Sequence, residues 1–442
     1  MLDLIVFTSF IIILVILFKE KFDLLSPNFW LPLLIGLYSY YSIKMAIVAG
    51  ELDFVVYSEV LSKGVIYGFL CLIAYITGSL FSKSFLKKKS VLHSPVIYSK
   101  KVIFIYLLIG LCGGFLIMKV QAGSVSNFVN NLHLRQEFAS GNSSIIFLLF
   151  PAKVAMFLYL DSIWKRNHGQ NGVSRMEWLF FVSLLALVLF WLSLLGGRLF
   201  SLMMIIQLLV IYSVFEKNVK KVFAISGIVS FFIFFVYGLY RFGQNKMQEG
   251  LVNSEIDFLF YAFENPEVIM KVLVTVFFDG WYVLLEYMRV VDQEMYTGFG
   301  VITLSALAKL VPGLFSYINN EFISITDAIN HASYMQYRAK SFLAQSYADF
   351  NMFGFILFFI LGFFIGYLNK PLDRIRSLAL VNKQQALSSL MSVYLYSIVF
   401  VNTLVMIRNG IHGAFTWLFV ESFWVLILLF VVSRGRVVFR NV

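Results

Sequence analysis

Five arginines lie at the ends of long apolar segments or in the loops between them: Arg135, Arg198, Arg241, Arg338 and Arg408. A guanidinium keeps its charge and offers a two-pronged donor that matches phosphate oxygens. Arg198 forms, with Gly196 and Gly197, the whole turn between two apolar segments, where Asn, Ser or Asp would be usual beside Gly. The group indicates a pyrophosphate site at a membrane surface. Snorkelling to lipid headgroups or a structural ion pair is the alternative for each arginine.

A histidine near its ordinary pKa can accept a proton from a hydroxyl group, as glycosyl transfer requires. Two of the five histidines lie among basic loops, which leaves three candidates: His133, His331 and His412. We prefer His331 because it precedes Arg338 by seven residues, which is two turns on one face of a helix. Asp327 and Asp349 are alternatives for this role, and a histidine bonded for structural reasons is the competing interpretation.

Two ionisable residues, Lys153 and Glu421, lie inside apolar segments. A charge at membrane depth costs about 2.5 to 3.5 kcal/mol on insertion scales, so both need partners or water. A structural ion pair is one interpretation. A proton or substrate pathway that also includes Lys63 is the transporter interpretation, and Glu421 is in addition a candidate partner for an outer arginine.

Several kinds of chemistry have no sequence signature. The chain lacks a P-loop, a GxGxxG segment after a strand, HExxH and GxSxG. Its two cysteines, Cys71 and Cys112, both lie in apolar segments, so neither a disulfide framework nor a thiolate metal site is expected. We therefore expect no metal and no cofactor.

The composition indicates a membrane protein. The chain of 442 residues is 60% hydrophobic and only 13% charged, with a mean hydropathy of +0.84. Soluble domains carry about 25% charged residues. The net charge of +11 fits an anionic membrane surface better than nucleic acid, because the basic residues gather in the short loops between apolar segments.

The apolar segments are close to the ~20 residues that a helix needs to cross a bilayer. We expect an all-α polytopic membrane protein with about eleven spans, at residues 2 to 18, 28 to 48, 60 to 82, 102 to 120, 144 to 161, 177 to 195, 199 to 215, 222 to 240, 350 to 368, 388 to 406 and 415 to 433. Two further segments, 268 to 288 and 298 to 318, are interrupted by charges and Pro312. They predict re-entrant or interfacial helices, and the count becomes thirteen if both cross.

Basic residues alternate from loop to loop. Of the 35 Lys and Arg, 21 fall in the loops on one side of the expected spans and in the C-terminal tail. The positive-inside rule places these loops in the cytoplasm and the N-terminus outside. The opposite loops are 49 to 59, 121 to 143, the turn Gly196 to Arg198, 241 to 349, and 407 to 414, and the longest carries 7 basic and 12 acidic residues.

This pattern predicts three parts: an N-terminal transmembrane bundle at 1 to 240, a large periplasmic loop at 241 to 349, and a C-terminal transmembrane bundle at 350 to 442. We see no sustained internal repeat, which weakens the transporter interpretation.

Four segments together resemble O-antigen polymerases, the Wzy-type oligosaccharide repeat-unit polymerases. LGGRLFSLMMIIQLLVIYSVFE at 195 to 216 resembles their Gly-Arg turn that opens a span. LHLRQEFASGN at 132 to 142 resembles an outer loop in which Gly follows Arg. RAKSFLAQSYADFNMFG at 338 to 354 resembles the end of their large loop, and GFGVITLSALAKLVP at 298 to 312 is similar to a further family segment.

The resemblance implies a metal-independent glycosyltransferase of the bacterial inner membrane with a GT-C-like architecture. It would transfer a growing glycan from undecaprenyl pyrophosphate to an incoming lipid-linked repeat unit. Its partners would be the lipid-linked oligosaccharide, membrane lipids and a membrane protein that regulates chain length, with no nucleic acid. His331, Arg198 and Arg338 would be catalytic, and Arg135, Arg241 and Arg408 would bind the substrate pyrophosphate. An O-antigen ligase and a lipid-linked oligosaccharide flippase are the alternatives.

Overall fold

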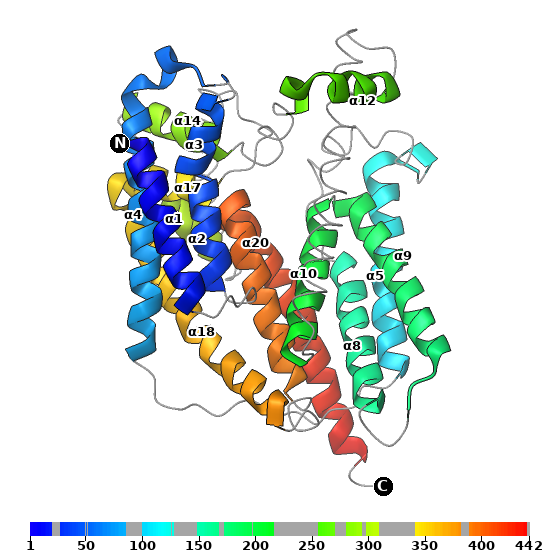
Figure 1. The fold of residues 1–442 in the computed structure, drawn as a ribbon. Helices are drawn as coiled ribbons and strands as arrows, with labels where there is room; N and C mark the ends of the chain where they lie inside the picture. Colours follow the sequence, from blue (N-terminus) through cyan, green and yellow to red (C-terminus); the bar gives the residue numbers. More distant parts are fainter. Residues whose placement is uncertain are drawn as a thin grey trace. The chain divides into compact units, whose positions relative to one another are not determined.

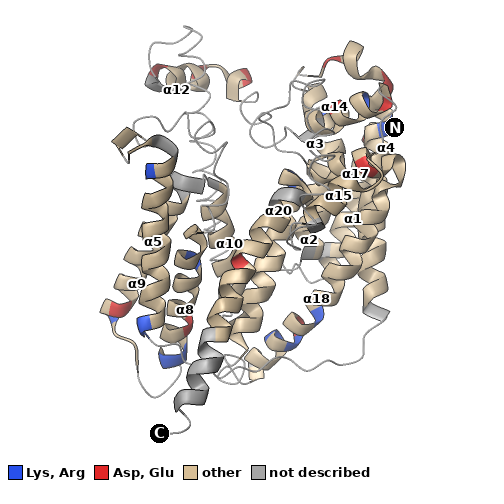
Figure 2. Ribbon diagram, turned by 180° about the vertical axis from the view of Figure 1, so that it is seen from behind, with Lys and Arg blue, Asp and Glu red and all other residues tan. Residues whose placement is uncertain are grey.

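The computed structural model describes residues 1–19, 27–48, 50, 52–84, 100–124, 126–127, 148–167, 172–196, 198–215, 255–269, 280–293, 298–308, 341–381 and 389–439. Within these ranges every regular element is a helix (Figure 1). The expected all-α membrane protein is confirmed at this level, because several of the helices are long and apolar enough to cross a bilayer. Figure 2 shows that charged residues are rare along the middle of α4 (Phe54–Ser84), α5 (Lys100–Ala122) and α9 (Arg175–Gly196).

Five helical segments in the described part of the chain pass as membrane spans: Phe54–Ser82, Lys100–Val120, Arg175–Leu192, Phe342–Ala379 and Leu390–Ile411. A sixth is the pair α2 (Pro27–Leu37) and α3 (Tyr40–Val48), which meet at a bend of 43°. Shorter apolar helices cover Leu2–Ile16, Leu199–Phe215 and Ala414–Phe430. All nine fall on expected spans.

Two expected spans are not among these nine helical segments. The segment 222 to 240 lies outside the described residues. The segment 144 to 161 overlaps α8 (Phe150–Asn167), which carries Lys153, Asp161, Lys165 and Arg166 and is mostly buried within the protein. The total of about eleven spans and the GT-C-like arrangement stay predictions.

The chain forms two compact units. The first comprises Met1–Lys89, Lys220–Lys370 and Asn402–Thr416, and the second comprises Ser90–Val219, Pro371–Val401 and Trp417–Val442. The division expected at residues 240 and 350 stays a prediction.

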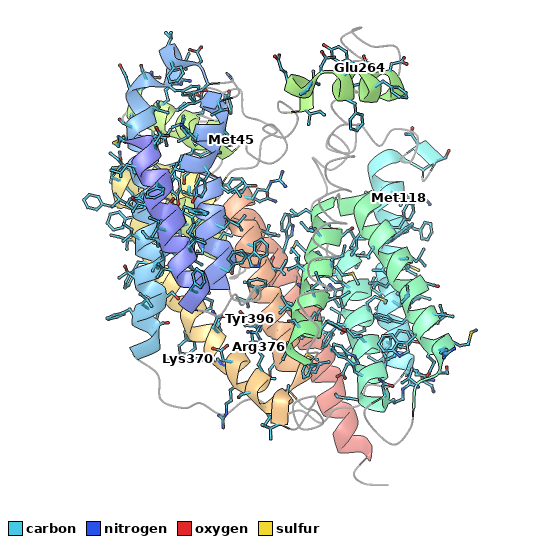
Figure 3. The ribbon with its side chains drawn as sticks, viewed as in Figure 1. Met45, Met118, Glu264, Lys370, Arg376 and Tyr396 are labelled. Carbon is cyan, nitrogen blue, oxygen red and sulfur yellow. The ribbon has the colours of Figure 1, made fainter. Side chains whose placement is uncertain are left out.

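In the first unit, α4 and α18 (Phe355–Val381) run parallel and touch through small residues. A Cβ on Gly78 would overlap the carbonyl oxygen of Phe359, and a Cβ on Gly362 would overlap that of Tyr75. Close backbone approach through small residues is the usual way in which helices associate in lipid. Lys370 lies on α18 (Figure 3) and donates to the carbonyl of Ser82 at 3.4 Å, so the C-terminal portions of the two helices lie together.

The expected loop contributes short helices to the first unit. These are α12 (Glu255–Glu264), α14 (Gly280–Gln293), α15 (Val301–Ala308) and α17 (Phe342–Phe350). Within 268 to 288 and 298 to 318 the structure describes the start of α14 and the whole of α15, and residues 270–279 and 309–318 lie outside the described residues. The interfacial or re-entrant interpretation of these two segments stays a prediction.

The core of the first unit joins α14, α15 and α17 to α2, α3, α4 and α18, through side chains such as Tyr40, Tyr67, Leu285, Tyr347 and Phe358. The helix α1 (Leu2–Lys19) contributes partly buried residues to its edge.

In the second unit, α5 and α8 are antiparallel and again meet at glycines, because a Cβ on Gly110 would overlap Ala152 and one on Gly113 would overlap Leu148. The helices α9 and α10 (Arg198–Phe215) follow in the chain.

The longest helix, α20 (Leu390–Phe439), is broken at Gly410 and doubles back (Figure 1). The hydroxyl of Tyr394 donates to Oε1 of Glu421 at 3.0 Å. A straight helix rises ~1.5 Å per residue and would hold residues 394 and 421 about 40 Å apart. The two arms therefore correspond to the two spans expected at 388 to 406 and 415 to 433.

Candidate functional site

The break in α20 is built on Gly410. Its φ of 79° and ψ of 169° lie outside the helical region, in a conformation that side chains other than glycine strongly disfavour. A break of this kind creates a second helix N-terminus, whose free N–H groups and partial positive charge attract anions. Broken helices in membrane proteins commonly place such ends at ligand sites.

One of the N–H groups at the break is held by α17. The backbone N–H of Ile411 donates to Oε1 of Gln345 at 2.8 Å, and this contact is buried. Gln345 is only 3% exposed. Because an N–H must face an acceptor, the hydrogen bond fixes the orientation of the Gln345 carboxamide.

Arg408 lies two residues before Gly410. Its Nε is buried, and among the described residues no acceptor lies within hydrogen-bonding distance of it. Buried donors in proteins nearly always have a partner, so an orphaned guanidinium nitrogen requires an explanation. A ligand with phosphate oxygens would provide the missing acceptors.

The helix α17 has further contacts away from the break, with α4 and with the turn that follows it. Gly354, which ends the resembling segment at 338 to 354, lies so close to Ser346 O and the hydroxyl of Tyr67 that a Cβ there would overlap both. The Tyr67 hydroxyl and Ser346 Oγ form a buried hydrogen bond at 2.7 Å. The segment that resembles the polymerases therefore ends at a glycine that close packing requires.

Asp349 holds the N-terminus of α15. Its Oδ1 accepts the N–H of Ile302 at 2.9 Å, and its Oδ2 accepts the N–H and the hydroxyl of Thr303 at 2.7 and 2.6 Å. The side chain is fully buried. A carboxylate occupied in this way acts as a helix cap, which argues against Asp349 as the base that activates the acceptor.

Asp292 on α14 joins three helices. Its carboxylate accepts from Nζ of Lys63 on α4 at 2.7 and 2.9 Å and from the hydroxyl of Tyr347 on α17 at 2.8 Å. The ammonium of Lys63 also lies 5.2 Å from the centre of the Tyr347 ring. The side chains of Lys63 and Asp292 are about one third exposed, at 32% and 28%.

A second polar link joins α4 and α14. The hydroxyl of Tyr57 donates to Oε2 of Glu286 at 2.9 Å, and Arg289 donates to both carboxylate oxygens of Glu286. The side-chain hydrogen bond with Glu286 raises the pKa of Arg289. The arginine is thus committed to a protein partner, unlike Arg408.

In the second unit, Lys153 and Glu421 form a buried ion pair, with Nζ and Oε2 2.7 Å apart. Gln207 on α10 donates to the same oxygen at 3.2 Å, and Tyr394 donates to the other. Every carboxylate oxygen thus has a donor. Among the described residues the charge partner of Glu421 is Lys153. The suggested pairing of Glu421 with an outer arginine stays a prediction, because four of the five outer arginines have side chains outside the described residues.

The structure tests few of the predicted site residues. His331, Arg338, Arg135, Arg241 and the alternative Asp327 lie outside the described residues. Arg198 is the first residue of α10, as the turn predicts, but its side chain is also outside what the structure describes. Arg408 is the predicted arginine whose surroundings are defined. No group of three metal-binding side chains occurs in the described part of the chain.

Gln345 was missed as a functional candidate. The signal was an amide side chain in FLAQSYADF of α17, a short segment in which Ser346 and Asp349 are also polar. Its partner Ile411 lies 66 residues away, a separation that sequence patterns do not reveal.

Comparison of the chain with protein families, with curated proteins and with solved structures finds no match.

Proposed function

We propose that the protein is an O-antigen polymerase of the bacterial inner membrane. It transfers the growing glycan from undecaprenyl pyrophosphate to the sugar of an incoming lipid-linked repeat unit at the periplasmic face. An acceptor hydroxyl attacks the anomeric carbon, the bond to the pyrophosphate oxygen breaks, and the hydroxyl proton passes to a base, for which His331 is the candidate. Arginines stabilise the charge that develops on the leaving pyrophosphate.

The observation that carries the proposal is Arg408. It combines a buried Nε that has no acceptor among the described residues with a position two residues before a helix break. The missing acceptor favours an anion, and so does the helix N-terminus that follows Gly410. The break falls in the turn at 407 to 414, which the distribution of basic residues places on the periplasmic side. Together with the four resembling segments, this favours a pyrophosphate-releasing enzyme.

The flippase alternative receives less support. Its proposed pathway residues are Lys63, Lys153 and Glu421, and each is held by a partner within the protein. A carboxylate that already accepts from Lys153, Gln207 and Tyr394 has little capacity to carry a proton or a sugar. An O-antigen ligase would use the same anion site, and the gene deletion described next distinguishes it from a polymerase.

The test is a gene deletion followed by electrophoresis of the cell's polysaccharide and complementation with variants. Deletion should leave lipopolysaccharide capped by a single repeat unit. Loss of all capped chains with retention of lipid-linked polymer would instead identify a ligase, and accumulation of cytoplasmic-face intermediates a flippase.

In the complementation, Arg408→Ala should abolish long chains. Arg408→Lys should shorten the chains, because lysine keeps the positive charge but lacks the two-pronged donor of the guanidinium. The matched control is Arg175→Ala, since Arg175 is the exposed first residue of α9 on the expected cytoplasmic side. Normal ladders from Arg408→Ala at normal protein levels would overturn the site.

A further inference from the structure

A side chain from another helix bonds to the main chain at the break of α20. Gln345 on α17 accepts the N–H of Ile411, the first residue after Gly410, at 2.8 Å. The main chain at Gly410 cannot supply this acceptor from a preceding helical turn, because the i to i−4 pattern is interrupted there. Gln345 therefore supplies, from another helix, the acceptor that the N–H of Ile411 lacks within α20.

The residues around this contact are buried. Ile407 and Ile411 on α20 and Leu343 and Ala344 on α17 belong to one buried core cluster. The hydrogen bond thus lies among buried apolar side chains, with Arg408 in the same stretch of α20.

The chemical type of residue 345 also matters. A carboxamide accepts the N–H without carrying charge. A carboxylate at the same place would accept it equally well, but would add a negative charge near Arg408 and compete with an anionic ligand. A neutral acceptor leaves the guanidinium available for phosphate oxygens.

We propose that Gln345 is a positioning residue of the pyrophosphate site: it holds the break of α20 in the conformation in which Arg408 meets the ligand. The inference rests on the proposed function, since the ligand is the pyrophosphate group of the lipid-linked donor. Gln345 acts through Ile411 and Arg408 and does not itself take part in the reaction.

The test uses the purified full-length protein in lipid nanodiscs and measures binding of radiolabelled inorganic pyrophosphate. Wild-type protein should bind it, and Arg408→Ala should not. Gln345→Met keeps the size of the side chain but removes the acceptor, and should weaken binding roughly tenfold, the order expected when one buried hydrogen bond is lost. Gln345→Glu should weaken binding at least as much, because it adds a negative charge to the site.

The matched control is Ser346→Ala. Ser346 is the next residue of α17, is also fully buried, and bonds to Tyr67 rather than to α20. This variant should lose stability without loss of pyrophosphate binding. Equal loss from Ser346→Ala and Gln345→Met would reduce Gln345 to a structural role and overturn the inference.

The failures of the two proposals are distinguishable. If wild-type protein binds pyrophosphate through Arg408 and Gln345→Met binds it normally, the positioning role is wrong and the proposed function stands. If wild-type protein does not bind pyrophosphate, or Arg408→Ala binds it normally, the proposed site is wrong and the positioning role with it.

Discussion

At the scale of single residues, the charged side chains described in the helices differ in whether all their polar atoms have hydrogen-bond or ion-pair partners within the protein. Lys153 and Glu421 are almost wholly buried and bonded to each other, and Gln207 and Tyr394 complete the carboxylate's contacts. Arg408, in contrast, has a buried nitrogen without a described acceptor. A satisfied buried pair maintains structure, whereas a donor without an acceptor can be satisfied by a ligand.

The ion pair gives a prediction about stability. Lys153→Met should destabilise the protein by about 3–5 kcal/mol because it leaves Glu421 buried without its charge partner. Glu421→Gln should do the same to Lys153. The double variant should be less destabilised than either single variant, since neither charge remains. Thermal unfolding in detergent, followed by size-exclusion chromatography, measures all three. Additive losses would show that the two residues do not stabilise each other.

Asp349 gives a second prediction. If it caps α15, Asp349→Asn should cost about 1–3 kcal/mol, because an amide group replaces one of two acceptor oxygens that face backbone N–H groups. Asp373→Asn on α18 is the control, since the Asp373 side chain is 70% exposed. The melting temperature in detergent should fall only for Asp349→Asn. Loss of polysaccharide polymerisation at an unchanged melting temperature would instead restore Asp349 as a candidate base.

At the scale of elements, sequence patterns identified which segments are helical more readily than what each helix touches. The spans at 60 to 82, 102 to 120 and 388 to 406 were evident because an apolar run of this length rarely forms anything other than a membrane-spanning helix. The pairs Lys153 with Glu421 and Lys63 with Asp292 were not, because 268 and 229 residues separate the partners. The contact of Gln345 with Ile411 was not evident either. It depends on the helix break at Gly410, and a single glycine is a weak sequence signal for such a break.

The glycines between α4 and α18 give an element-scale prediction. Gly362→Ala should destabilise the first unit by about 1–3 kcal/mol or more, because the new Cβ would overlap the carbonyl oxygen of Tyr75, which belongs to the backbone of a packed helix and cannot move alone. Gly172→Ala is the matched control, because nothing lies within 4 Å of the position a Cβ would take there. Thermal unfolding should separate the two variants. Equal stability would mean that α4 and α18 do not approach as closely as this.

At the scale of the whole molecule, helix directions and loop charges form one consistent scheme. The charge pattern predicts that the spans at 60 to 82 and 350 to 368 run the same way, and that those at 102 to 120 and 144 to 161 run opposite ways. The packing of α4 with α18 is parallel and that of α5 with α8 is antiparallel. Relative directions thus agree, although the absolute orientation rests on the basic loops alone.

That orientation can be tested with two cysteines placed at exposed positions beyond opposite ends of described helices. The background variant replaces Cys71 and Cys112 with alanine. In it, Ser124→Cys follows α5 on the expected periplasmic side, and Gly172→Cys precedes α9 on the expected cytoplasmic side. A membrane-impermeant maleimide should label position 124 in spheroplasts and position 172 only after permeabilisation. Because Arg408 lies in a turn assigned to the same side as residue 124, the reverse labelling would place the anion site on the cytoplasmic face. Polymerisation of periplasmic repeat units at Arg408 would then be ruled out, even if that arginine binds pyrophosphate.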